Sequence, residues 1–179
     1  MVYTESFGAA AFIARVRTVA LRNTGAAISP FNAFMLLQGL ETLGLRMERH
    51  CENALAVASF LQQHPKVTRV NYPGLSDNRY FALAQKYTQG RPSALLTFEI
   101  KGGLDEGIKL HDGLNLFKKL VNIGDAKSLV CHPASTTHRQ LSADELQKAG
   151  VSPSLLLLSV GIEDKDDLIA DLQQALDSL

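Results

Sequence analysis

The segment from Asn122 to His138, NIGDAKSLVCHPASTTH, contains the residues of this chain that are best suited to chemistry. Small, hydroxyl and amide residues crowd together here, where an element of the core would be apolar. Neutral N–H and O–H groups can bind a carboxylate or a phosphate without a paired charge. Alternatively, Ser128, Ser135 and the threonines satisfy backbone groups in turns, which the residue types by themselves favour. Both interpretations predict a loop.

Other reactive residue types in this chain favour structural roles. Cys131 and His132 are adjacent, and neighbours in an extended segment point to opposite sides, so they cannot easily share a proton. Lys127 could be imagined as a Schiff-base lysine, but its local sequence favours a side chain that faces solvent. We expect Arg46 and Arg49 to lie on a solvated helix face, and anion binding is the alternative. The cysteines and histidines have no metal-ligand spacing, so no metal site is expected.

The elements that would position the loop are short strands and helices. Alternating or continuous apolar residues predict three strands, of which the clearest is ALLTFEI followed by Gly102-Gly103. Ser142 and Glu145 have the spacing of a capping box, which predicts a helix start there and a stop at Gly150. The predicted strands cover 67–72, 94–100 and 155–160, and further helices cover 104–111 and 164–179.

The first third of the chain has only helical patterns. A helix over 9–22 should stop at Gly25, and Ser29-Pro30 is a strong second start, because serine caps free N–H groups and proline has a preset φ. Apolar residues then recur at three-to-four-residue spacing up to His64-Pro65, with Asn53 among the polar residues of the other face. A helix of this length spans on the order of 50 Å. A kink near Gly39 or Gly44 would shorten it.

These patterns predict a mixed α/β chain of the α+β kind, a small sheet covered by helices and preceded by a long helical arm. We expect the arm at 1–64 and the sheet-and-helix domain at 65–179. Lys plus Arg equals Asp plus Glu at 18 each, so no net charge attracts nucleic acid or an acidic membrane. No stretch approaches the roughly 20 apolar residues of a membrane helix, and the start has no signal-like run. With two cysteines, a cytoplasmic location fits best.

Four ordered stretches resemble the Cys/Met-metabolism family of pyridoxal-phosphate enzymes. QGLETL and NIGDAKSL are most similar to the O-acetylhomoserine sulfhydrylases within that family. The resemblance covers nearly the whole chain and only the carboxyl-terminal part of the family. The stretches are SPFNAFMLLQGLETLGLRMERH at 29–50, VNYPGL at 70–75, NIGDAKSLVCHPASTTH at 122–138 and LSVGIE at 158–163.

The resemblance implies a fold type I architecture, in which a long helix leads from a cofactor domain into a small carboxyl-terminal domain of sheet and helices. It also implies a reaction in which sulfide or a thiol replaces the acetate of O-acetylhomoserine, with the pyridine ring of pyridoxal phosphate storing electrons. The products would be acetate and homocysteine or methionine. The family implies a homo-oligomer, with a tetramer as its usual form.

The resemblance also assigns residues. Ser128 matches a residue near the substrate carboxylate, and Asn122 lies on the same loop, so both are expected to bind substrate. The arginine that clamps the substrate carboxylate in the family falls on Leu157, which offers neither charge nor hydrogen bonds. The cofactor lysine of the family lies before the matched region. We therefore expect no catalytic residue in this chain and no covalent attachment of pyridoxal phosphate.

Two functions follow as expectations. The first is the carboxyl-terminal domain of an O-acetylhomoserine sulfhydrylase-like enzyme, inactive alone. The second is a non-catalytic module that pairs with itself or with a full-length relative. In either case apolar residues of the arm, such as Phe31, Phe34 and Met35, should favour self-association.

Overall fold

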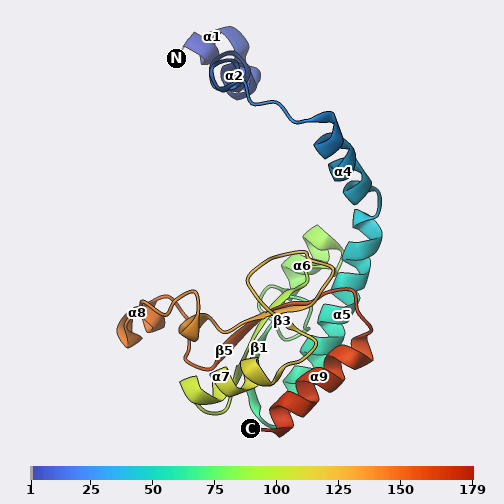
Figure 1. The fold of residues 1–179 in the computed structure, drawn as a ribbon, viewed down its shortest axis with the longest axis vertical. Coiled ribbons are helices and arrows are strands. Elements are labelled where there is room, and N and C mark those ends of the chain that lie inside the picture. The colour runs from blue at the N-terminus through green and yellow to red at the C-terminus, as the bar shows by residue number, and fades with distance from the viewer. Residues whose placement is uncertain (1) are drawn as a thin grey trace. The chain divides into compact units, whose positions relative to one another are not determined.

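The computed structural model describes residues 2–179, with side chains from residue 4 onward, and its contacts divide the chain into two compact units. The first unit is 1–43 and the second is 44–179. Figure 1 colours them from blue at the amino terminus to red at the carboxyl terminus. Within 2–179 no helix is long and apolar enough to cross a membrane.

The first unit is helical. It contains α1 (Val2–Phe7), a 3-10 turn η1 (Gly8–Ala10), α2 (Ala11–Arg15), a π-helical stretch η2 (Val16–Leu21), α3 (Arg22–Thr24) and α4 (Pro30–Glu41). Gly25 ends α3 in the left-handed conformation at φ 63°, as predicted. The Ser29 hydroxyl accepts from the Asn32 N–H at 3.1 Å, and Pro30 is the first helical residue. The predicted start of α4 is therefore confirmed.

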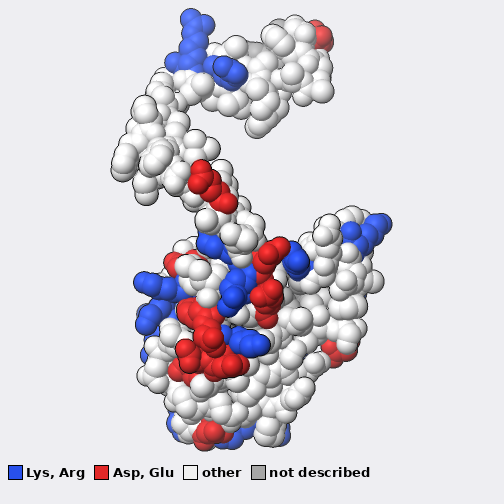
Figure 2. All heavy atoms as spheres, turned by 90° about the vertical axis from the view of Figure 1, so that its right-hand side faces the viewer, with Lys and Arg blue, Asp and Glu red and all other residues white. Residues whose placement is uncertain are grey.

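Helix α4 is apolar on all sides. Its one charged residue is Glu41, and none of its residues is buried. Figure 2 shows the same stretch with mostly white, uncharged atoms on the visible side. Its large apolar side chains are each at least 55% exposed, namely Phe31, Phe34, Met35, Leu36, Leu37 and Leu40.

The predicted helix from 30 to 63 is two helices. Helix α4 ends at Glu41, Thr42 has non-helical angles (φ −104°, ψ 5°), and α5 runs over Leu43–Gln63. Gly39 and Gly44 flank the break, and glycine weakens a helix because it loses the most backbone freedom on folding. The interruption thus lies between the two positions that the sequence suggested.

The second unit contains one five-stranded sheet with the order β1-β2-β5-β4-β3. All neighbouring strands are antiparallel except β3 and β4, which are parallel. The three predicted strands are present, and burial alternates along β2 as its sequence pattern requires. The strands are β1 (Val67–Asn71), β2 (Leu95–Ile100), β3 (Lys118–Lys119), β4 (Leu129–Cys131) and β5 (Leu155–Ser159).

Helices pack on this sheet to form one core (Figure 1). Helix α5 contributes Val57 and Leu61, α7 contributes Leu110, and α9 contributes Leu168 and Leu172, all fully buried with residues of β2 and β5. The helices that follow β1 are α6 (Phe81–Thr88), α7 (Leu104–Gly113), the 3-10 turn η3 (Pro133–Ser135), α8 (Ala143–Lys148) and α9 (Lys165–Asp177). The mixed α/β class, a small sheet covered by helices, is as predicted.

Helix α8 begins with the predicted capping box. The Ser142 hydroxyl accepts from the Glu145 N–H, and the Glu145 carboxylate accepts from the Ser142 N–H at 2.8 Å. Gly150 follows the helix at φ 72°. The sequence predicted both the start and the stop of α8, because a helix cap involves residues only a few positions apart.

Three features differ from the sequence-based expectation. Strands β3 and β4 were missed, because both lie in or next to the segment interpreted as a loop. Asn53 was assigned to the polar face of its helix but is 1% exposed. The compact sheet-containing unit begins at residue 44, whereas the sequence suggested 65, because one face of α5 packs into the sheet core.

Candidate functional site

The site predicted from sequence centres on the connection from β3 to β4. Asn122 lies on this connection and is exposed, and its Oδ1 accepts the N–H of Ile123 at 2.9 Å. That bond leaves the side-chain NH₂ of Asn122 unused by any hydrogen bond within the described chain. Asn122 can therefore offer two N–H donors to a ligand.

Ser128 lies at the end of the same connection in a different environment. It is 0% exposed, and its N–H donates to Glu163 Oε1 at 2.6 Å. Its hydroxyl donates to Glu163 Oε2 at 2.9 Å and accepts from the Gly161 N–H at 2.7 Å. Its carbonyl accepts from the Lys118 N–H at 2.8 Å. Every polar group of Ser128 is thus engaged inside the protein.

The turn from β5 to α9 lies directly against this end of the loop. The Ile162 N–H donates to the carbonyl of Ala126 at 3.0 Å. A Cβ added to Gly161 would lie 2.2 Å from Glu163 Oε2, 2.5 Å from Ala126 O and 2.6 Å from Ser128 N. Those distances are shorter than contacts between real atoms, so the close approach of the two segments requires glycine at 161.

Helix α5 fixes the same turn from the other side. Asn53 Nδ2 donates to the carbonyls of Gly161 at 3.0 Å and Glu163 at 2.8 Å. His50 Nδ1 lies 2.6 Å from the carbonyl of Val160. Because a carbonyl only accepts, this ring nitrogen carries the hydrogen. Two buried polar residues of α5 therefore bind the carbonyls of Val160, Gly161 and Glu163 in the LSVGIE turn.

Leu157 lies in the middle of the sheet on β5, half-buried. It pairs with Thr97 of β2 on one side and Cys131 of β4 on the other. Two positions along the same strands, Arg69 of β1 pairs with Glu99 of β2, and their charged groups are 3.5 Å apart. The row formed by Asn71, Thr97, Leu157 and Cys131 contains no positive charge, and Arg69 already faces an acidic partner.

Cys131 and His132 do not face each other. Cys131 Sγ lies 3.3 Å from the hydroxyl of Thr136, whereas His132 Nδ1 lies 2.8 Å from the hydroxyl of Ser135. His132 Nε2 lies 2.7 Å from the carbonyl of Pro153, and burial lowers the pKa of this imidazole below its usual 6.5. The two residues have separate structural partners, as the sequence argument expected.

Every lysine of the chain except Lys66 is exposed, Lys127 included. The Lys66 ammonium donates to the carbonyls of Leu176 at 2.8 Å and Asp177 at 3.2 Å, at the end of α9. A cation at the carboxyl end of a helix is a common stabilising arrangement. Each of these lysines is therefore either open to solvent or, for Lys66, engaged with helix carbonyls.

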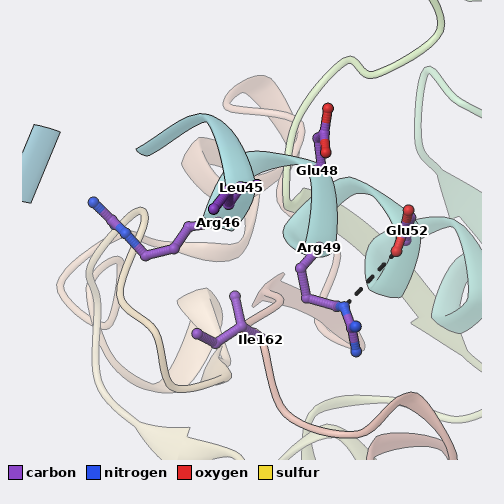
Figure 3. A pocket seen from close by; sticks show the side chains of 6 residues that line it. All are labelled: Leu45, Arg46, Glu48, Arg49, Glu52 and Ile162. Carbon is purple, nitrogen blue, oxygen red and sulfur yellow. Dashed lines mark ion pairs between the residues drawn. The ribbon is translucent and has the colours of Figure 1, made fainter. Parts of the chain in front are cut away.

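A hollow of the second unit lies beside α5 and has a volume of about 540 Å³. Figure 3 shows Arg46 and Arg49 extending in different directions, with Ile162 of the β5–α9 turn among the lining side chains. Arg49 is paired with Glu52 at 3.8 Å, and Glu48 also lines the hollow. On the face shown in Figure 2, blue and red atoms are intermixed over part of this unit. Two basic and two acidic residues give the hollow no preference for anions.

Among residues 2–179, no group of three His, Cys, Asp or Glu side chains is placed to hold a metal ion. A family model described as Cys/Met metabolism PLP-dependent enzyme matches residues 6–177. The chain belongs to this family.

Individual members of the family are similar over almost the whole chain. An O-acetyl-L-homoserine sulfhydrylase of Leptospira meyeri is 56% identical over 178 residues, which are 98% of this chain and 40% of the relative. A homocysteine synthase of Schizosaccharomyces pombe is 50% identical over 99% of this chain and 41% of the relative. The chain thus spans about two fifths of the length of these relatives.

A solved structure from Campylobacter jejuni has the same fold. It is described as a putative O-acetylhomoserine (thiol)-lyase, and it matches with a TM-score of 0.83 and 50% identity over 93% of this chain and 39% of that chain. That protein contains N′-pyridoxyl-lysine-5′-monophosphate, so its cofactor is joined to a lysine. The lysines of the present chain do not fit that role, because they are exposed or, for Lys66, bound to helix carbonyls.

The structure brings together part of what the sequence predicted for this family member. Asn122 and Ser128 share one connection, and a substrate contact for either stays a prediction. Leu157, at the position of the family's arginine, lies on the adjacent strand. Sequence reasoning missed Glu163 and Asn53, which hold the connection in place. The available signal was a carboxylate directly after a buried strand and a glycine turn, within the LSVGIE motif.

Proposed function

We propose that this chain is the carboxyl-terminal part of an O-acetylhomoserine sulfhydrylase-type transferase. The whole enzyme would break the bond from the γ-carbon of O-acetylhomoserine to the acetate oxygen and form a bond from that carbon to sulfur. Acetate leaves, and sulfide or a thiol becomes homocysteine or methionine. The observation that carries the proposal is the 56% identity over 98% of this chain to a named sulfhydrylase.

In this proposal the chain supplies the Asn122 loop and no cofactor lysine. The exposed positions of its lysines support inactivity of the chain alone. Pyridoxal phosphate would be bound by a polypeptide that carries the remaining three fifths of the family's length, consistent with the 40% coverage. A cytoplasmic location fits the free cysteines Cys51 and Cys131.

The first test uses the purified chain with pyridoxal phosphate. Borohydride reduction followed by peptide mass spectrometry should find no pyridoxyl-lysine, and visible absorbance of a lysine-bound cofactor should be absent. A single reduced lysine at stoichiometric occupancy would overturn the proposal that this chain lacks the attachment site.

The second test co-expresses the chain with the segment of the Leptospira meyeri relative that it does not match. We expect a complex that releases acetate and homocysteine from O-acetylhomoserine and sulfide. The variant Leu157→Arg is measured in parallel, because a guanidinium binds a carboxylate bidentately, and it should lower KM roughly tenfold or more. A stable complex that lacks turnover with either form would contradict the sulfhydrylase assignment.

A second function is supported by α4. A helix that is apolar on all sides and has no buried residue is typical of an element covered by another body. In this second proposal the chain is a non-catalytic module that associates with itself or with a full-length relative. The stable but inactive complex of the previous experiment would favour it.

A further inference from the structure

We propose that Glu163 and Ser128 form a latch that positions the Asn122 loop, so that Ser128 acts through the loop and does not itself contact a substrate. The latch consists of the two hydrogen bonds from Ser128 to the Glu163 carboxylate and the bond from the Gly161 N–H to Ser128 Oγ. Its relevance to substrate binding rests on the proposed function, whereas the latch itself is a property of this chain.

A count of donors and acceptors carries the proposal. A serine hydroxyl has one hydrogen to donate and two lone pairs. The Gly161 N–H can only donate, so Ser128 Oγ accepts there, at 2.7 Å. An ionised carboxylate can only accept, so the hydroxyl hydrogen goes to Glu163, at 2.9 Å. The Ser128 N–H is also taken by Glu163, at 2.6 Å.

A substrate carboxylate needs donors, and Ser128 has none left. It is also 0% exposed, so a ligand could reach it only after the latch had opened. The charged acceptor makes these bonds stronger than bonds between neutral groups. Asn122, by contrast, is exposed and has an unused side-chain NH₂ within the described chain. The two residues predicted to share one role therefore have different ones.

The latch connects three elements that are far apart in sequence. Asn53 of α5 holds the backbone of the β5–α9 turn at Gly161 and Glu163. Glu163 then holds Ser128, and the Ser128 carbonyl accepts from Lys118 of β3. Both ends of the connection that carries Asn122 are thereby tied to the sheet. Its conformation depends on Glu163, although Glu163 lies 41 positions from Asn122 in the sequence.

The first measurement uses the chain alone. We expect Glu163→Ala to raise amide hydrogen exchange at Ser128 roughly tenfold or more and to shift the side-chain NH₂ signal of Asn122 in ¹⁵N NMR spectra. Glu145→Ala is a matched control, because Glu145 makes the same two kinds of contact with Ser142 in an exposed cap. It should leave both signals unchanged. Should Glu163→Ala fail to fold, Glu163→Gln keeps the size and removes the charge.

Unchanged exchange at Ser128 and an unmoved Asn122 signal in a folded Glu163 variant would overturn the latch. This result is independent of the sulfhydrylase assignment, since it needs no cofactor, substrate or second polypeptide. If the latch measurements succeed and the co-expressed complex has no turnover, the proposed function fails and the latch stands as a structural device of this chain.

The second measurement tests positioning in the active complex of the co-expression experiment. Ser128→Ala and Glu163→Ala should each raise KM for O-acetylhomoserine several-fold with a smaller change in kcat, and the double variant should be no worse than either. Ser128→Thr, which retains the hydroxyl, should recover most of the loss. If Ser128 instead contacts substrate, its substitution should raise KM further in the Glu163→Ala background, which would contradict the proposal.

Discussion

His132 is held as a neutral ring by its surroundings. The carbonyl of Pro153 only accepts, so Nε2 carries the hydrogen, and Nδ1 accepts from the Ser135 hydroxyl. A Cβ on Gly107 would lie 2.4 Å from Nε2, so the ring fits only because residue 107 is glycine. Burial lowers the pKa, with His111 acting in the same direction, while the Pro153 carbonyl and Asp112 oppose it.

This lowered pKa predicts a pH dependence of stability. The unfolded histidine gains a proton as pH falls below about 6.5, whereas the folded one, with its lowered pKa, takes up a proton only at lower pH, so the unfolded state is favoured. The contribution is complete above about pH 6.5 and is lost progressively below it. The free energy of unfolding from urea titrations should fall between about pH 7 and 5, and His132→Gln should reduce that slope by up to about 1.4 kcal/mol per pH unit.

The carboxylates of Glu106 and Glu145, which cap helices, titrate below the pH range in which His132 acts. Backbone N–H donation from Gly103 lowers the pKa of Glu106 below 4.5, and donation from Ser142 does the same for Glu145. Their stabilising effect is present above about pH 4.5 and is lost at lower pH. Identical slopes for wild type and His132→Gln between about pH 7 and 5 would contradict the buried neutral state of His132.

Asp171 of α9 binds the backbone of the segment that connects α7 to β3. Asp171 is 7% exposed, and its carboxylate accepts from the N–H groups of Asn115, Leu116 and Phe117, at distances from 2.8 to 3.3 Å. These residues connect α7 to β3. Because the backbone groups have no pairing in the sheet, the carboxylate does for them what a neighbouring strand would do.

Removing this carboxylate should destabilise the second unit strongly. We expect Asp171→Ala to lower the free energy of unfolding by about 3 kcal/mol or more, because it breaks charge-assisted bonds and leaves partly buried donors unpaired. Asp171→Asn should cost less, since its amide oxygen still accepts. Urea unfolding measures both, with exposed Asp177→Ala as a control expected to stay within about 0.5 kcal/mol. A loss below about 1 kcal/mol for Asp171→Ala would count against this anchoring role.

The whole chain combines a well-packed sheet unit with a helical unit whose apolar side chains face water. All six large apolar residues of α4 are at least 55% exposed, and they point to every side of the helix. A flat contact would cover only one side. We infer that α4 is covered by a partner that surrounds it, either further copies of this chain or the rest of a family member.

Self-association of the purified chain tests the first of these. Light scattering at micromolar concentration should give a mass above the 19.5 kDa of one chain. The double variant Phe34→Glu with Leu36→Glu, which places charges on two sides of α4, should shift the mass toward one chain. Leu83→Glu on α6 is the matched control, because Leu83 is also exposed, at 49%. A strictly monomeric wild type would contradict self-association and leave the rest of a family member as the partner that covers α4.

Sequence alone determined the features that depend on near neighbours. The cap at Ser29-Pro30, the capping box of Ser142 and Glu145, and the alternation along β2 all appear as predicted. Each involves residues within a few positions, so local stereochemistry and burial on one face are sufficient to specify them. The strand and helix patterns predicted the mixed α/β class and the motifs predicted family membership, and both are confirmed.

Only the tertiary structure decided how the loop is held. Strands β3 and β4 pair with partners distant in sequence, and polar Asn53 is buried because it binds a turn 108 positions away. Ser128 donates hydrogen bonds to both carboxylate oxygens of Glu163, which is 35 positions away in the sequence. A hydrogen bond over such a separation leaves no periodic trace in the sequence, since either residue type would be equally at home in solvent. Folding brings the partners together, and burial then makes their pairing obligatory.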